Sequence, residues 1–174
     1  RIQKFDSSGT YQTQWGSVGS SNSQFSSPSG VAVDTSGNVY ITDTDNDRVQ
    51  KFDANGTYVT KWGATGSGDG QFIGPRGIVT DSSGNVYITD TSNNRIQKFN
   101  SSGTYIAQWG SYGTGNGGFQ YPYGIASDIS GSIYVADSGS NRIQKFNSSG
   151  TYIAQWGGNY SLDSIALGGF AGVY

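Results

Sequence analysis

Cysteine, histidine, methionine and glutamate are all missing from the 174-residue sequence, and only three residues are proline. Without cysteine the chain cannot be a disulfide scaffold. Zinc sites lose two of their three usual ligand classes, and a serine nucleophile has no histidine to take its proton. All twelve acidic residues are aspartate, so acid–base chemistry would rest on that side chain alone. We therefore expect no catalytic residues, no metal site, no cofactor and no enzymatic activity.

Charge and long apolar segments are also scarce. Only 13% of the residues are charged, the net charge is −2, and eight of the ten basic residues fall at repeated positions. This distribution leaves no basic patch for nucleic acid. No apolar run approaches the roughly 20 residues of a membrane helix, so we expect neither nucleic-acid binding nor membrane insertion. The sequence opens at Arg1 with no signal peptide, and we expect a processed or trimmed product.

Repetition is the dominant feature of the sequence. Arginines at positions 1, 48, 95 and 142 open nearly identical segments, at a constant step of 47 residues. A fixed period of this size is typical of repeat architectures, in which each unit buries its apolar face only against its neighbours.

One period contains four β-branched and aromatic segments, at residues 77–80, 85–90, 95–99 and 104–109. Turn residues separate them, with Asp first and Gly fourth in the first turn, as a type I turn prefers. Alternation in the last segment predicts that Tyr105, Ala107 and Trp109 share one face of a strand. The 28 glycines are spaced too closely for ordinary helices. Four antiparallel strands per period predict an all-β fold, a β-propeller with sheets stacked around a central channel.

The segments between these units share a pattern of their own. Each keeps a phenylalanine three residues before a proline, in the pairs Phe25 and Pro28, Phe72 and Pro75, and Phe119 and Pro122. We interpret the phenylalanine as a plug between blades and the proline as a stiff entry to the innermost strand.

The stretch 81–90 reads DSSGNVYITD, and 94–99 reads NRIQKF. These words resemble the NHL repeat, and copies in register cover residues 1–157. The resemblance implies a β-propeller, commonly with six blades. This sequence departs from that number, because it holds three complete blades, at 30–62, 77–109 and 124–156, and the outer half of another at 1–15. We expect about four blade equivalents in one domain, residues 1–174.

The tail, residues 157–174, abandons the outer-strand words, but Ser164–Leu167 and Gly172–Tyr174 resemble inner strands. One hypothesis is that the tail pairs with the strands of 1–15 and closes a four-bladed ring, which removes an open edge. A second is that it completes a neighbouring copy of the chain. A third is that the chain is part of a longer propeller.

Aspartates recur at two positions of each blade, namely Asp34, Asp81 and Asp128, and Asp43, Asp90 and Asp137. Converging carboxylates would suit a calcium ion. The competing interpretation is that each aspartate caps its own turn or pairs with the arginine of the repeat. We favour the structural interpretation, because residues copied in every blade serve the blade.

Residues that differ between blades are the better candidates for binding. The residue after each repeated proline varies, as Ser29, Arg76 and Tyr123, and should lie near the mouth of the channel. Asp45 and Asp47 in the first blade are replaced in the others, and Tyr121, with Tyr112, enriches one sector in aromatic rings, as interfaces often are. Neutral variation of surface loops would give the same pattern.

These features predict a non-enzymatic binding or structural scaffold that presents variable loops on one propeller face to a protein or glycan ligand, or to further copies of itself. The alternative is a Ca²⁺-dependent hydrolase or lyase with a site in the central channel. Four N-glycosylation acceptor patterns, at Asn55, Asn100, Asn147 and Asn159, and the acidic, charge-poor surface favour an extracellular or cell-surface location.

Overall fold

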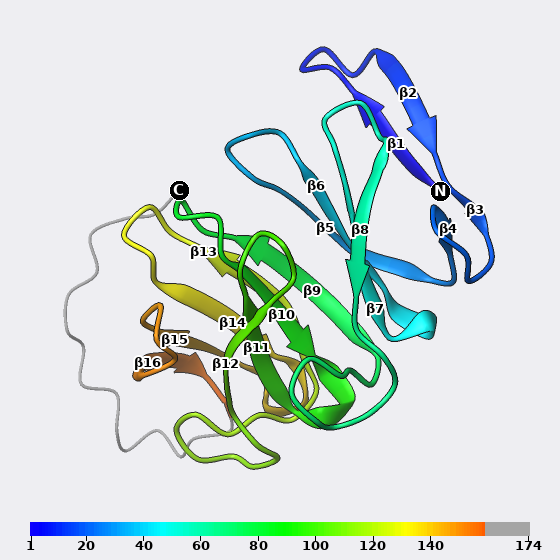
Figure 1. Cartoon of the computed structure of the whole chain (residues 1–174). Coiled ribbons are helices and arrows are strands. Elements are labelled where there is room, and N and C mark those ends of the chain that lie inside the picture. Colours follow the sequence, from blue (N-terminus) through cyan, green and yellow to red (C-terminus); the bar gives the residue numbers. More distant parts are fainter. Residues whose placement is uncertain (159–174) are drawn as a thin grey trace.

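The structure is a computed structural model, and it describes residues 1–158. It is an all-β arrangement of three four-stranded antiparallel sheets and one hairpin, as the sequence predicts (Figure 1). The hairpin comprises β1 (Ile2–Phe5) and β2 (Tyr11–Trp15). The first blade comprises β5 (Pro28–Val33), β6 (Val39–Asp43), β7 (Arg48–Phe52) and β8 (Tyr58–Trp62). The second comprises β9 (Pro75–Thr80), β10 (Val86–Asp90), β11 (Arg95–Phe99) and β12 (Tyr105–Trp109). The third comprises β13 (Pro122–Ser127), β14 (Ile133–Asp137), β15 (Arg142–Phe146) and β16 (Tyr152–Gly157).

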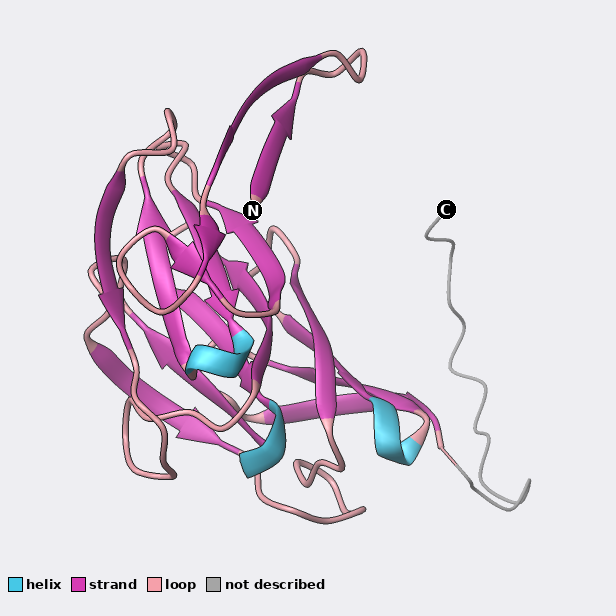
Figure 2. Ribbon diagram, turned by 90° about the vertical axis from the view of Figure 1, so that its right-hand side faces the viewer, coloured by secondary structure: helices cyan, strands magenta, loops and turns pink. Residues whose placement is uncertain are grey.

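Each inner strand begins at the repeated proline, two residues before the predicted blade starts at 30, 77 and 124. Proline is tolerated there because the first residue of a strand need not donate to the ladder. The links between strands and between blades also contain short regular elements. Single 3₁₀ turns join the second and third strands, η1 (Thr44–Asn46), η2 (Thr91–Asn93) and η3 (Ser138–Ser140). All three turns lie toward the same end of the blades (Figure 2). The first linker also forms the short parallel pair β3 (Ser17–Val18) and β4 (Gln24–Phe25).

The apolar core lies between the sheets rather than within any one of them. One buried cluster joins the hairpin to the first blade, a second joins the first blade to the second, and a third joins the second blade to the third. Phe72 is fully buried between the first two blades, and its ring lies 5.7 Å from that of Phe99. The prediction of a phenylalanine plug is therefore confirmed.

The predicted sharing of one face by Tyr105 and Trp109 is wrong. Phe99 pairs with Tyr105 but Lys98 pairs with Ala107, so Ile106 is an extra residue in the outermost strand. This β-bulge reverses the alternation. Tyr105 consequently packs in the cluster between the first and second blades, and Trp109 in the cluster between the second and third.

The four units follow one another as an arc, with the hairpin at one end and the third blade at the other (Figure 1). The inner strands β5, β9 and β13 contact each other in that order. The closing strands that we predicted in the tail fall in residues 159–174 and lie outside the described residues.

The inner strands of successive blades approach each other closely at Gly30 and Gly77, each two residues after the repeated proline. A Cβ atom on Gly77 would overlap the carbonyl oxygen of Tyr123 in the third blade, whereas one on Gly124 would meet only Ala136 Cβ, at 3.5 Å. The glycine of the second blade is thus required by the neighbouring strand and not by its own turn.

We predict that Gly77→Ala lowers the free energy of unfolding by about 1–3 kcal/mol, because the added methyl group overpacks the contact between inner strands. The matched variant Gly124→Ala occupies the same repeat position without that contact, and it should leave stability unchanged or slightly raised. Urea unfolding of the two variants measures the difference. Equal destabilisation of both would contradict the inter-blade origin of the requirement.

Candidate binding surface

The links between blades and the 3₁₀ turns meet on one face of the arc, which we call the linker face. Backbone hydrogen bonds join the two kinds of link in every blade. Asp45 N–H donates to Ser26 O at 3.2 Å, Ser92 N–H to Ile73 O at 3.1 Å, and Gly139 N–H to Gln120 O at 2.7 Å. The variable residues of both kinds of link are therefore brought to the same surface, as the sequence predicts.

Ser29, Arg76 and Tyr123 stand at a β-bulge at the start of each inner strand. Pro75 pairs with Asp90 and Ile78 with Ile88, so the register shifts just where Arg76 lies, and the same shift occurs in the other two blades. A bulge redirects a side chain away from the alternation of the strand. All three side chains are exposed.

The backbone of this row is held by the preceding blade. The Thr42 hydroxyl donates to the carbonyl of Arg76 at 2.6 Å, and the Thr89 hydroxyl donates to that of Tyr123 at 2.9 Å. Both threonines are fully buried. The exposed side chains therefore project from a fixed backbone rather than from a mobile loop.

The three residues also form a continuous row across the blades. The Ser29 hydroxyl donates to the Arg76 carbonyl at 3.3 Å, and the Arg76 guanidinium lies 4.8 Å from the centre of the Tyr123 ring. The second contact is a cation–π interaction. A cation, an aromatic ring and a hydroxyl are thus assembled on one exposed strip, a combination suited to binding rather than to proton transfer.

The other three candidates have mixed outcomes. The Asp45 carboxylate is exposed and accepts hydrogen bonds from the hydroxyls of Ser26 and Ser27 in the adjoining linker. The Asp47 carboxylate is occupied by the next linker, because it accepts from the Thr65 hydroxyl at 2.7 Å and from Gly74 N–H at 2.8 Å. We assign Asp47 to the link between blades rather than to a ligand.

Tyr121 keeps an exposed ring beside the row. Its backbone has a left-handed φ of 55°, and its N–H donates to the Asn94 side chain at 2.9 Å. Sequence reasoning missed Ile73, which is 39% exposed on the linker face. The other linkers carry the polar residues Ser26 and Gln120 at this repeat position. The change to an apolar residue in one linker could have identified Ile73 from the sequence.

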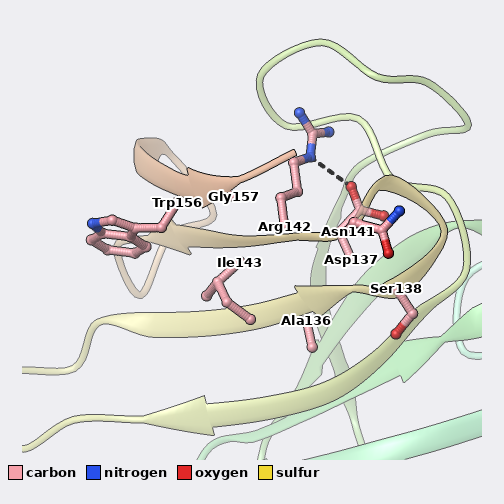
Figure 3. Close-up of a pocket in the computed structure, with 8 residues that line it drawn as sticks. All are labelled: Ala136, Asp137, Ser138, Asn141, Arg142, Ile143, Trp156 and Gly157. Atoms are coloured by element: carbon pink, nitrogen blue, oxygen red, sulfur yellow. Dashed lines mark hydrogen bonds and ion pairs between the residues drawn. The ribbon is translucent and has the colours of Figure 1, made fainter. Parts of the chain in front are cut away.

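The carboxylates of Asp43, Asp90 and Asp137 are fully buried and serve the blades. Each accepts from the arginine Nε of its own blade at 2.7 Å, as Figure 3 shows for Asp137 and Arg142. The second oxygen of Asp137 accepts from Gln120 N–H at 2.6 Å. The depression of about 600 Å³ drawn in Figure 3 is open, and its acid and base are already paired with each other.

The remaining ring of aspartates caps turns. Asp81 Oδ1 accepts from the N–H groups of Ser83 and Asn85, and Oδ2 accepts from the Asn85 amide and the Tyr87 hydroxyl. Burial alone would raise the pKa of Asp81, but these hydrogen bonds outweigh burial and hold the pKa below its ordinary value of 3.8. Burial and the bond to Asp81 raise the pKa of Tyr87.

Within residues 1–158, no three acidic residues gather in a way that would hold a metal ion. No helix in that part of the chain is long and apolar enough to cross a membrane. The recurring aspartates are explained by arginine pairs and turns, so the structural interpretation accounts for their contacts.

Four-stranded sheets stacked through their faces define a β-propeller, and solved structures share this fold. A catalytically inactive virginiamycin B lyase from Staphylococcus aureus with quinupristin is 16% identical, with a TM-score of 0.64 over 87% of this chain and 46% of that one. A streptogramin B lyase is 21% identical, with a TM-score of 0.59 over 74% of this chain and 40% of that one. Hydrazine synthase from Kuenenia stuttgartiensis is 14% identical, with a TM-score of 0.60 over 78% of this chain and 37% of that one.

The model of the NHL repeat matches residues 25–52, 72–99 and 119–146, and the chain belongs to the NHL-repeat family. No curated protein matches the chain. The chain spans less than half the length of each of the three solved structures named above. At these identities the likeness establishes the fold.

We predict that Asp81→Asn lowers the free energy of unfolding by about 1–3 kcal/mol at pH 7, because the amide nitrogen that replaces Oδ2 is a donor and cannot accept from either the Asn85 amide or the Tyr87 hydroxyl. Because the pKa of Asp81 is lowered by folding, its contribution is present above pH 3.8 and is lost as the pH falls through the folded value. The difference between the parent and the variant should therefore shrink at acidic pH.

The matched control is Asp53→Asn. Asp53 holds the turn between β7 and β8 by accepting the N–H groups of Asn55 and Thr57 at Oδ1, and asparagine already does the same at position 100. Backbone hydrogen bonds also lower the pKa of Asp53, but asparagine keeps those bonds, so this variant should lose less stability at pH 7 than Asp81→Asn does. A pH-independent difference for Asp81→Asn would show that its charge is not what stabilises the turn.

Proposed function

We propose that the protein is a non-enzymatic binding scaffold that acts outside the cell or at the cell surface, and that it takes a protein or glycan ligand on the linker face. The observation that carries the proposal is the row formed by Ser29, Arg76 and Tyr123, with Arg76 on the ring of Tyr123. Arginine and tyrosine, with tryptophan, are enriched among the side chains that contribute most binding energy at interfaces, and tyrosine buries a large area at low entropic cost.

The mechanism is rigid display. Ligand binding to a mobile loop costs the entropy of ordering it, but the carbonyls of Arg76 and Tyr123 are already held by buried threonines. The exposed Tyr121 and Asp45 flank the row and would complete the contact surface. Substitution of these exposed residues would then change which ligand is bound without changing the fold of the blades.

The proposed location is supported by the exposed hairpin tips. Asn55 is exposed at the tip of the hairpin between β7 and β8. Asn100 and Asn147 stand at the first position of the equivalent turns, where the side-chain oxygen of each accepts two backbone N–H bonds. Of the three acceptor patterns in residues 1–158, those at Asn55 and Asn147 are exposed, and the oxygen-mediated turn contacts leave the Asn147 amide nitrogen free of those bonds.

A lyase or a Ca²⁺-dependent hydrolase is the second candidate, since two of the proteins of similar fold are lyases. Such chemistry needs a base or a metal site at the mouth of the channel. The carboxylates of the linker face are engaged instead, Asp47 by the next linker and Asp43 by Arg48. We therefore favour binding over catalysis.

We predict that the double variant Arg76→Ala and Tyr123→Ala loses ligand binding by at least tenfold while unfolding like the parent. An array of neutral and acidic glycans and a displayed peptide library, both screened with the parent chain, supply the probes. Lys61→Ala is the matched control, because Lys61 is the other basic residue outside the repeated positions and is exposed on the outermost strand β8. Binders that tolerate the double variant, or no binder in either library, would contradict the proposal.

A further inference from the structure

The two ends of the arc expose surfaces that are buried everywhere else in the molecule. Ile143, on the third blade, is 40% exposed, whereas its equivalents Val49 and Ile96 are fully buried against the following blade. At the other end Phe5 is 52% exposed, whereas its equivalents Phe52 and Phe99 are at most 1% exposed. The first surface normally faces a following blade, and the second normally faces a preceding one.

The contacts between successive units follow a fixed rule. The lysine of the third strand donates to a carbonyl 50 residues further on, from Lys4 to Ala54 at 3.3 Å, from Lys51 to Ser101 at 2.9 Å and from Lys98 to Ser148 at 3.0 Å. The next lysine in the series is Lys145. By the repeat step of 47 residues, the carbonyl that matches Ala54, Ser101 and Ser148 is that of Ser7, in the turn of the β1–β2 hairpin.

A tryptophan and a glycine obey the same rule. Trp15 packs on Gly56, Trp62 on Gly103 and Trp109 on Gly150, at distances that leave no room for a Cβ atom. The equivalent glycine of the hairpin is Gly9, and a Cβ atom there would meet nothing within 4 Å. The surface over Gly9 is therefore open, whereas in each later repeat the tryptophan of the preceding unit covers the equivalent glycine.

On its open face, the third blade keeps the residues that contact the outer two strands of a following blade, but it lacks the residue that holds a following inner strand. Tyr134, Ile143 and Lys145 keep the residue types of the other blades or a close equivalent. The buried threonine that holds the next inner strand, Thr42 or Thr89, is replaced by Ala136, which cannot donate a hydrogen bond. The β1–β2 hairpin corresponds to the third and fourth strands of a blade, and within residues 1–158 it forms a sheet of these two strands alone. It therefore matches the part of a following blade that the third blade can contact.

These surfaces lie far apart in one molecule. The hairpin is packed on the first blade through Ile2 and Trp15, and the third blade is at the opposite end of the arc (Figure 1). A second virginiamycin B lyase structure from Staphylococcus aureus, 16% identical with a TM-score of 0.61, matches 92% of this chain over 50% of its own length. Two copies of this chain placed end to end would therefore supply about the length of that propeller chain, with each hairpin beside the third blade of the other copy.

We propose that two copies of this chain associate head to tail, with the β1–β2 hairpin of each docked on the open face of the third blade of the other. Lys145 then donates to the Ser7 carbonyl of the second copy, and Phe5, Tyr11 and Ile143 become buried. Two such contacts close a ring, which leaves neither surface open.

Light scattering on the 174-residue chain tests the association. The parent should have a mass of roughly twice 18.4 kDa, and Ile143→Asp should raise the dissociation constant at least tenfold and give the single-copy mass. Ile129→Asp is the matched control, because Ile129 lies in a turn of the third blade and is 97% exposed. It should remain dimeric. Cooperative unfolding of the dissociated variant shows that the fold is intact, since Ile143 is already partly exposed in the single chain.

The two-surface geometry has its own test. Phe5→Asp and Ile143→Asp should each be monomeric alone, but an equimolar mixture should recover dimers, because one of the two contacts is then intact. Association through a single self-complementary patch predicts no recovery.

Cross-linking separates two copies from closure within one chain. The sequence has no cysteine, so Ser7→Cys and Lys145→Cys can be made in separate chains and mixed with a short bis-maleimide. The mixture should give a covalent dimer in larger yield than either variant alone. A parent that stays monomeric at every concentration, a mass that rises without limit, or a cross-link found only within a chain carrying both cysteines would overturn the proposal.

Discussion

Each sheet has two faces to bury, and in residues 1–158 no α-helix covers either face, so both faces of a blade are buried only when it stands between two others. The residues of β10, in the second blade, are all buried, whereas Tyr134 and Ala136 of β14, at the end of the arc, are only half buried. The two strands, VYITD and IYVAD, share Tyr and Asp, exchange Val and Ile at two positions, and differ in kind only where Thr89 is replaced by Ala136. Neighbouring blades, rather than intrinsic strand propensity, therefore decide how much of a strand is protected, as expected for a repeat protein.

Polar contacts give this stack its register. The buried pair of Asp90 and Arg95 ties the second strand to the third, and the arginine also donates to three carbonyls of the incoming linker, those of Ser67, Gly68 and Gln71. A buried ion pair is a poor source of net stability but fixes geometry, because a misplaced partner leaves a charge unpaired. The linker is thereby fastened to the blade, and the bulge residues that follow it are presented at a defined place.

Much of this could be predicted from the sequence, because the repeat copies its structural residues. The strand sequence, the phenylalanine plug, the proline at the inner strand and the aspartate turns are all signalled by residue types with few other uses. The gathering of variable links on one face also followed from the topology.

The bulges could not be predicted, because they depend on the register between two strands and not on the sequence of either. One bulge sends Tyr105 and Trp109 to opposite blades, and another turns Arg76 outward onto Tyr123 of the next blade. Asp47 looked like a variable surface residue, but its role is set by the linker that reaches it, through Gly74. These side-chain roles depend on contacts between blades, which cannot be predicted from the sequence of a single repeat.

Native-state amide hydrogen exchange on the monomeric Ile143→Asp chain tests most directly whether neighbouring blades supply the stability. If they do, the amides of β10 and β11, which have a blade on each side, will be the most protected, and those of β15 and of the β1–β2 hairpin will exchange through smaller openings. Equal protection of the second and third blades, despite their different burial, would contradict the account.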